Sequence, residues 1–152
     1  MPDIYVDGDA CPVKQEVLRV AERHGLTVYL VANSWMRLGA QPLLKQVVVG
    51  EGLDAADDWI AEHIATDDLV VTGDIPLAAR CLARGALALN HSGKPFTPDN
   101  IGMALAMRDL KAQLRDSGEI KDQGPGFSKA DRSRFLQALD TALTAAAREA
   151  GK

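Results

Sequence analysis

Residues 4–32 read IYVDGDACPVKQEVLRVAERHGLTVYLVA and predict a strand, a helix and a second strand. Ile4–Val6 is a short run of strand-forming residues. Val13–His24 has apolar side chains at helical spacing, and Gly25 follows at a position that often ends a helix. Leu26–Ala32 is continuous and apolar, as expected for a buried strand of a parallel sheet.

The same alternation continues towards the C-terminus. Further strands are expected at Gln46–Val49, Leu69–Thr72 and Ala86–Leu89, with helices at Leu53–Ala65 and from about Pro76 to Arg84. The rest of the chain is helical, with helices expected at Asp99–Arg115 and Ser128–Glu149, a loop at Ser117–Phe127, and a capping motif formed by Ser128 and Asp131. We predict an α/β fold, a three-layer sandwich with a mainly parallel sheet of about five strands and a helical C-terminal extension. One domain is expected over residues 1–152, with residues 98–152 packed on a core of residues 1–97.

The composition fits one domain, since 47% of the 152 residues are hydrophobic and 25% are charged. The net charge of −4 provides no overall basic footprint, so any contact with nucleic acid must use a local basic patch or a bound cation. No apolar run is long enough to span a membrane, and the N-terminus has no signal pattern. The sequence therefore predicts a cytoplasmic protein without a membrane partner. It does not fix the oligomeric state, and a homodimer is compatible with it.

The two cysteines, Cys11 and Cys81, are too few to indicate a disulfide framework. Cys11 lies near a predicted helix start, where a thiolate is favoured, although no histidine adjoins it to support a catalytic thiol. Cys81 is expected in the core. The histidines and cysteines show no spacing typical of a zinc site.

Polar residues follow the predicted strands where each of them ends. Asp7 and Asp9 come after the first strand, Asn33-Ser34 after the second, and Asp74 after the fourth. Ligands of open parallel sheets bind outside the carboxyl ends of the strands. We therefore expect these carboxylates and the amide to share one edge of the sheet.

The helix expected after the third strand carries three more acids, Asp54, Asp57 and Asp58. Asp57 lies on the apolar stripe that includes Ile60 and Ile64. A carboxylate on a core face is costly unless it is paired or bound to a cation, and this helix contains no lysine or arginine. Asp57 is therefore the member of the trio whose position most calls for a partner.

Several carboxylates at one point repel each other unless a cation is present. Oxygen ligands suit Mg²⁺ or Mn²⁺, which can activate a water for attack on a phosphodiester. Ordinary structural roles also fit these residues. Asp9 and Asp74 can cap the helices that follow them, and Asp54 and Asp58 can be first-turn acids favoured by the helix dipole.

Basic and aromatic residues supply candidate contacts to nucleic acid. Trp35 beside Arg37 could stack on a base, although an exposed loop with an anchoring tryptophan explains the same pattern. The other candidates are His91 and Lys94 after the fifth strand, and Lys129, Arg132 and Arg134 near the start of the last helix, where a solvated helix face is the ordinary interpretation.

With these motifs in view, the chain resembles the YaiI/YqxD family of bacterial proteins, whose function is unassigned. The resemblance covers almost the whole chain. The matching stretches are Asp7–Pro12, Val31–Ser34, Gly52–Ile60, Thr72–Leu77 and Gly126–Phe135.

That family looks related to PIN and NYN domains, which are metal-dependent ribonucleases. The resemblance implies that Asp7 and Asp74 are the first and last acids of their pattern, and that the middle acid is one of Asp54, Asp57 and Asp58. It also implies attack of a metal-bound water on RNA. The long C-terminal helical part lies outside the minimal PIN pattern.

The strand-end acids and the resemblance predict the same site. Asp7, Asp57 and Asp74 are the leading metal ligands and catalytic residues. Asp9 and Asp54 assist by orienting ligands or water, and Asn33 hydrogen-bonds a carboxylate or the substrate. The expected contacts to RNA are Asn33, Ser34, Arg37, Lys94, Lys129 and Arg132.

Two other functions compete with a nuclease. A phosphatase of the haloacid dehalogenase type also has Asp-x-Asp after its first strand, with Asp7 as nucleophile and Asp9 as acid and base. That pattern expects a second aspartate where this chain has Ala78, and a lysine that Gly50–Thr66 lacks. The third alternative is a module that binds nucleic acid or a nucleotide without cutting it.

Overall fold

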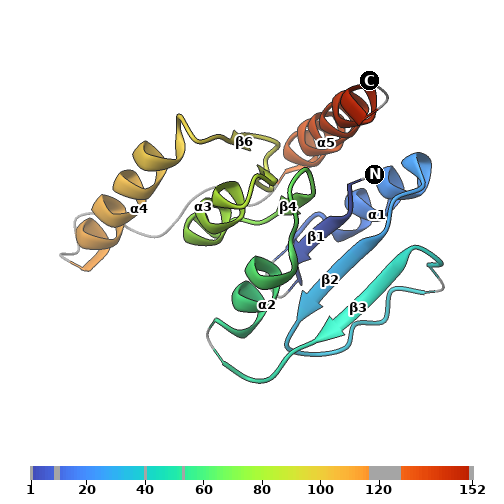
Figure 1. The fold of residues 1–152 in the computed structure, drawn as a ribbon. Helices are drawn as coiled ribbons and strands as arrows, with labels where there is room; N and C mark the ends of the chain where they lie inside the picture. Colours follow the sequence, from blue (N-terminus) through green and yellow to red (C-terminus); the bar gives the residue numbers. More distant parts are fainter. Residues whose placement is uncertain (1, 9–10, 40, 53, 117–127, 151–152) are drawn as a thin grey trace.

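The described residues form a six-stranded sheet at the centre of the molecule (Figure 1). The structure is a computed structural model that describes residues 2–8, 11–39, 41–52, 54–116 and 128–150. The sheet order is β3-β2-β1-β4-β5-β6, and all neighbouring strands are parallel except β5 and β6. The strands are β1 (Ile4–Asp7), β2 (Val28–Ala32), β3 (Leu44–Val48), β4 (Leu69–Val71), β5 (Leu87–Leu89) and β6 (Pro95–Phe96).

Helices cover both faces of this sheet, which gives the predicted three-layer sandwich. The helices are α1 (Lys14–His24), α2 (Ala55–His63), α3 (Ile75–Ala83), α4 (Ile101–Asp116) and α5 (Lys129–Ala150). One apolar core contains side chains of α1 and α5, and the other contains side chains of α2 and α3. Successive side chains of the central strand β1 point to opposite faces of the sheet. Val6 therefore lies in the first core and Tyr5 in the second.

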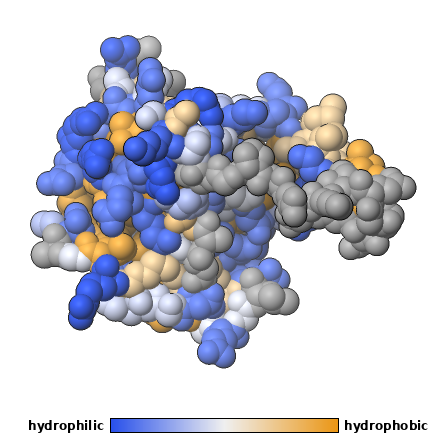
Figure 2. Space-filling model, turned by 180° about the vertical axis from the view of Figure 1, so that it is seen from behind, coloured by the Kyte–Doolittle hydropathy of each residue, from blue (hydrophilic) through white to orange (hydrophobic). Residues whose placement is uncertain are grey.

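The two C-terminal helices pack on different parts of the molecule. α5 lies against α1 and buries Phe135, Leu139 and Leu143 almost completely. α4 lies against α3 and leaves Met103 and Met107 exposed. Hydrophobic side chains are visible on the projecting α4 in the opposite view (Figure 2). None of the helices in the described part of the chain has the length and apolarity needed to cross a bilayer.

The strands and helices that the sequence predicts are present, with ends that differ by a few residues. β2 begins at Val28 because Leu26 still donates its N–H to Ala21, which completes the turn that ends α1 at Gly25 (φ 68°). The capping motif at α5 is confirmed, since Ser128 and Asp131 exchange hydrogen bonds. The antiparallel strand β6 was not predicted. The expected loop at Ser117–Phe127 lies outside the described residues.

Candidate active site

Asp7 and Asp74 lie at the point where the strand order reverses. The chain adds β2 and β3 on one side of β1, and then β4 and β5 on the other. A crevice at the carboxyl ends of two such central strands is the usual ligand site of an open α/β sheet. Asp7 is the last residue of β1, and Asp74 follows β4 after Thr72 and Gly73.

Close packing behind Asp7 explains the glycine that follows it. A Cβ at Gly8 would lie 2.7 Å from a methyl carbon of Leu30 and 3.2 Å from the carbonyl oxygen of Val31. A larger residue would therefore push the chain away from β2 just after Asp7.

Thr72 connects the two strand ends. Its side chain is fully buried, and its hydroxyl donates to Asp7 Oδ2 at 3.4 Å while accepting from the backbone N–H of Asp74 at 2.9 Å. One hydroxyl thus contacts both acidic residues. A threonine at a strand end has many uses, so this role was not recognisable from the sequence alone.

Asp74 also caps α3, as the ordinary structural interpretation expected. Its Oδ1 accepts from the N–H of Leu77 at 3.0 Å. Its carboxyl group also forms a hydrogen bond with Asp57. The capping role and the contact with a second acid therefore occur together.

Asp57 is the acid of α2 that meets the strand ends. Burial raises its pKa to about 7, and the neighbouring charges of Asp74 and Asp7, the hydrogen bond to Asp74 and the charge of Asp54 act in the same direction. Ile60 and Ile64, on the same stripe, are fully buried. Near neutral pH the carboxyl group of Asp57 is therefore only partly ionised.

The other two acids of this region are placed differently. Asp58 forms a salt bridge with Arg80 of α3, with 2.9 Å between Oδ1 and Nη1. Asp54 is exposed at the N-cap of α2 and makes no capping hydrogen bond through its side chain. Asp9, with its predicted helix-capping role, lies outside the described residues.

The donor set is of the kind that Mg²⁺ and Mn²⁺ prefer, because Asp7, Asp57 and Asp74 offer only carboxylate oxygens. Within the described ranges, no group of three or more His, Cys, Asp or Glu side chains is arranged so that it could hold a metal ion. Mg²⁺ usually retains several waters and binds through one or two carboxylates together with substrate phosphates. The hydrogen-bonded pair of Asp57 and Asp74 offers such a partial ligand set.

His91 is a basic neighbour of this edge. Its ring lies 3.3 Å from the position a Cβ would take on Gly73, and its buried Nε2 has no hydrogen-bond partner among the described atoms. Burial, and secondarily the charge of Lys14, hold the pKa of His91 below its usual value. The sequence pointed to His91 only as a nucleic-acid contact, although its place after a strand end was a usable signal.

The predicted contacts in the loop after β2 lie on the surface. The amide of Asn33 donates to the Gly50 carbonyl at 2.9 Å, and Ser34 and Arg37 are exposed. Trp35 is 71% exposed and therefore does not anchor this loop. The side-chain amide of Gln46 holds the loop instead, because it accepts from Met36 N at 2.9 Å and donates to Met36 O at 2.6 Å.

The predicted contacts near α5 have separate environments. Arg132 donates to the Pro12 carbonyl at 2.6 Å and pairs with Glu16 at 3.4 Å, so it attaches α5 to the start of α1. Lys129 is exposed at the start of α5, and Lys94 is exposed in the loop before β6.

The cysteines do not take part in this chemistry. Burial raises the pKa of Cys11 to about 11 and that of Cys81 to about 12, so both thiols are protonated at neutral pH. At Cys11, desolvation outweighs the effect of the nearby helix start, which by itself would favour a thiolate.

Comparison with known proteins gives relatives without an assigned activity. A family model described as "Uncharacterized BCR, YaiI/YqxD family" matches residues 5–145. A UPF0178 protein of Parvibaculum lavamentivorans is 63% identical, and the alignment covers 95% of each chain. UPF0178 protein Atu1478 of Agrobacterium fabrum is 59% identical, with 91% of each chain covered. No solved structure matches the chain.

Proposed function

The chain belongs to the YaiI/YqxD family. The names of its relatives state no activity, so its chemistry must be inferred from the site. We propose that it is a cytoplasmic, metal-dependent nuclease of the PIN-like type that hydrolyses phosphodiester bonds in RNA. One observation supports this most strongly. Asp7, Asp57 and Asp74 come from three elements, and burial, followed by the negative charges of Asp74 and Asp7, raises the pKa of Asp57 to about 7. A divalent cation would relieve the repulsion among these charges.

In this proposal Asp7, Asp57 and Asp74 hold Mg²⁺ or Mn²⁺. Once bound, the cation would supply an activated water and neutralise the charge that develops on the phosphodiester. Thr72 ties the two segments together, because its hydroxyl donates to the carboxylate of Asp7 and accepts from the backbone N–H of Asp74. Asp54 adds negative charge beside Asp57. For Asp9, which lies outside the described residues, we keep the expected role of orienting ligands or water. Asp58 is the weakest of the predicted ligands, because its carboxylate is paired with Arg80.

A phosphatase of the haloacid dehalogenase type fits the site less well. The aspartate that such an enzyme needs four residues after Asp74 is replaced by Ala78, whose side chain is fully buried in the core. A carboxylate would not fit there without disturbing α3. Hydrolysis of an aryl phosphate is the reaction that distinguishes this enzyme class from a nuclease.

The test compares cleavage of a mixed-sequence RNA with hydrolysis of an aryl phosphate, each with Mn²⁺, with Mg²⁺ and with EDTA. We expect RNA cleavage that requires the metal, and loss of at least about a hundredfold in Asp7→Asn and Asp74→Asn, since each removes charge from the metal site. Asp67→Asn is the matched control, because Asp67 is exposed at the amino end of β4 with φ 72°, which asparagine tolerates.

Circular dichroism and the unfolding midpoint show whether the variants keep the fold. Cleavage at the wild-type rate in either folded variant would contradict the assignment of the ligands. Aryl phosphate hydrolysis without RNA cleavage would identify a phosphatase. RNA binding with neither reaction would identify the non-catalytic module.

A further inference from the structure

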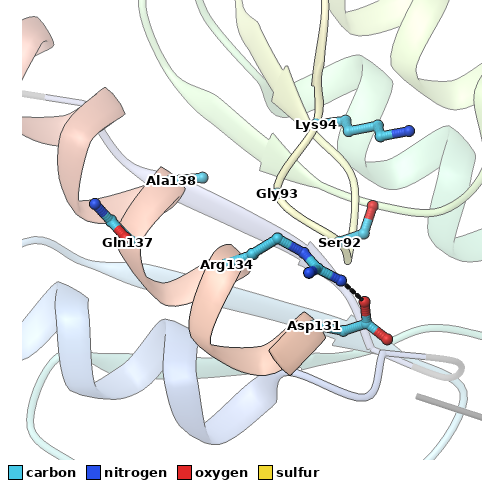
Figure 3. A pocket seen from close by; sticks show the side chains of 7 residues that line it. All are labelled: Ser92, Gly93, Lys94, Asp131, Arg134, Gln137 and Ala138. Atoms are coloured by element: carbon cyan, nitrogen blue, oxygen red, sulfur yellow. Dashed lines mark hydrogen bonds and ion pairs between the residues drawn. The ribbon is translucent and has the colours of Figure 1, made fainter. Parts of the chain in front are cut away.

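A cavity of about 660 Å³ lies between the loop that joins β5 to β6 and the start of α5 (Figure 3). It is lined by Ser92, Gly93, Lys94, Asp131, Arg134, Gln137 and Ala138. Its volume is in the range of sites that hold small molecules of nucleotide size. Such a space is far larger than a single phosphate needs.

The loop that lines one side of this cavity also borders the edge that carries the acids. His91 packs against Gly73, the residue before Asp74, and Ser92 is the next residue along the chain. A polymer bound at Asp74 and extending past His91 would therefore meet Ser92 at the wall of the cavity. This geometry suits a neighbouring unit of the same chain.

The loop wall of the cavity is ordered before any ligand binds. Asn90 Oδ1 accepts from Ser92 N at 2.8 Å, from Ser92 Oγ at 2.7 Å and from Lys94 N at 3.1 Å. Gly93 has φ 90°, and a Cβ there would be 2.9 Å from the carbonyl oxygen of Arg134. The loop thus fits directly against α5, which only glycine allows at this position.

Three charged side chains line the cavity. Lys94 and Arg134 are cations, and Asp131 is an anion whose oxygens already have hydrogen-bond partners. Asp131 Oδ2 accepts from Ser128 N at 3.0 Å and from Ser128 Oγ at 2.9 Å, and its Oδ1 pairs with Arg134. These bonds hold the pKa of Asp131 below its usual value. Figure 3 shows Arg134 extended along α5 towards Asp131, and Lys94 at the rim with its side chain directed away from α5.

Lys94 is the cation that is free to act. Its ammonium group has no hydrogen-bond or ion-pair partner among the residues that the structure describes. Arg134 uses one end of its guanidinium for Asp131, and the remaining N–H groups are available to an acceptor. An arginine and a flexible lysine around a small apolar floor are suited to a phosphate and the sugar or base attached to it.

We propose that this cavity binds a nucleotide of single-stranded RNA adjacent to the cleaved bond, with Arg134 contacting its phosphate and Lys94 reaching the same phosphate when its flexible side chain turns from the rim towards α5. The assignment rests on the proposed nuclease function for the identity of the polymer. The floor of Gly93 and Ala138 lies beneath the sugar or base, and Gln137 offers an amide to its polar edge.

The test measures binding of a fluorescently labelled, mixed-sequence single-stranded RNA by anisotropy in EDTA, so that no metal-dependent cleavage occurs. We expect Lys94→Ala and Arg134→Gln each to raise the dissociation constant roughly 5- to 10-fold, and to lower the slope of log affinity against log salt by about 0.7, as for one lost phosphate contact. Lys94→Glu should weaken binding further than Lys94→Ala.

Two exposed cations serve as matched controls. Arg148 lies on α5 roughly 21 Å beyond Arg134, and Lys111 lies on α4. Arg148→Gln and Lys111→Ala should bind RNA like the wild type, and all variants should show the wild-type circular dichroism spectrum.

The outcomes separate this inference from the nuclease proposal. Wild-type affinity and salt slope in both cavity variants would overturn the inference even if the protein cleaves RNA, as would a wild type that does not bind RNA in EDTA. Weakened binding in the cavity variants would support it even if no metal induces cleavage, in which case only the nuclease proposal fails.

Discussion

Among single residues, Asp57 distinguishes this site from a set of surface carboxylates, because its raised pKa lets it keep a proton that a surface aspartate would lose. Asp57 is half-buried and hydrogen-bonded to Asp74, and its pKa is raised from 3.8 to about 7. The unfolded chain has no such neighbours, so its Asp57 ionises near the usual pH. Folding and protonation of this one side chain are therefore linked.

The linkage predicts a pH-dependent stabilisation in Asp57→Asn. Between about pH 4 and pH 7 the folded protein retains a proton that the unfolded chain has lost, so the free energy of unfolding falls as the pH rises through this window. Asparagine cannot ionise and still donates to Asp74. We expect the variant to gain on the order of 1–2 kcal/mol at pH 8, after allowance for solvent screening, and less at pH 5.

Urea denaturation at the two pH values, without added metal, measures this difference. Asp67→Asn, which changes an exposed acid of the same type, should show the same small effect at both pH values. An equal gain for Asp57→Asn at pH 5 and pH 8 would mean that the pKa of Asp57 is not raised in the folded protein.

At the scale of elements, periodicity was enough to predict the strands and helices that bury a full face. β6 was missed because a two-residue strand such as Pro95–Phe96 carries no alternation, and only its pairing with Ala88 and Leu89 defines it. The choice among Asp54, Asp57 and Asp58 was also beyond the sequence. It depends on how α2 is rotated against β1 and on the presence of Arg80 in α3, which are tertiary properties.

The different packing of α4 and α5 predicts different costs for the same substitution. Leu139 of α5 is fully buried against the core that contains α1, whereas Leu110 of α4 is 47% exposed. Leu139→Ala should lower the free energy of unfolding by about 2–5 kcal/mol, because it leaves a cavity. Leu110→Ala should change it by less than about 0.5 kcal/mol.

The urea concentration at the midpoint of unfolding measures the effect in both variants, provided that the dependence of the free energy of unfolding on urea concentration is unchanged. A small effect of Leu139→Ala would show that α5 is only loosely attached to the α/β core in solution. Because Arg134 and Lys94 lie on opposite sides of the α5 cavity, that result would also remove the rigid wall on which nucleotide binding depends.

At the scale of the whole molecule, the acids link parts that are distant in sequence. Asp7 belongs to β1, Asp57 to α2 and Asp74 to the start of α3, so a cation bound among them would favour the folded state of all three. We expect saturating Mn²⁺ to stabilise the protein, by about 2.7 kcal/mol when its concentration is a hundred times the dissociation constant.

Thermal unfolding with and without Mn²⁺ measures this stabilisation. The shift should disappear in Asp74→Asn and persist in Asp67→Asn. A shift that persists in Asp74→Asn would place the cation at another site, and the nuclease proposal would lose its metal centre.

The contact between Gln46 and Met36 has a consequence for Trp35, the residue beside it. Because one amide bonds both polar groups of the Met36 backbone, the chain that carries the indole is already arranged before anything touches it. In a flexible segment, each residue that a ligand immobilises would cost about 1–2 kcal/mol of conformational entropy. The backbone that carries this 71%-exposed ring is therefore ordered in advance, so that a ligand contacting the loop would cost little further backbone entropy.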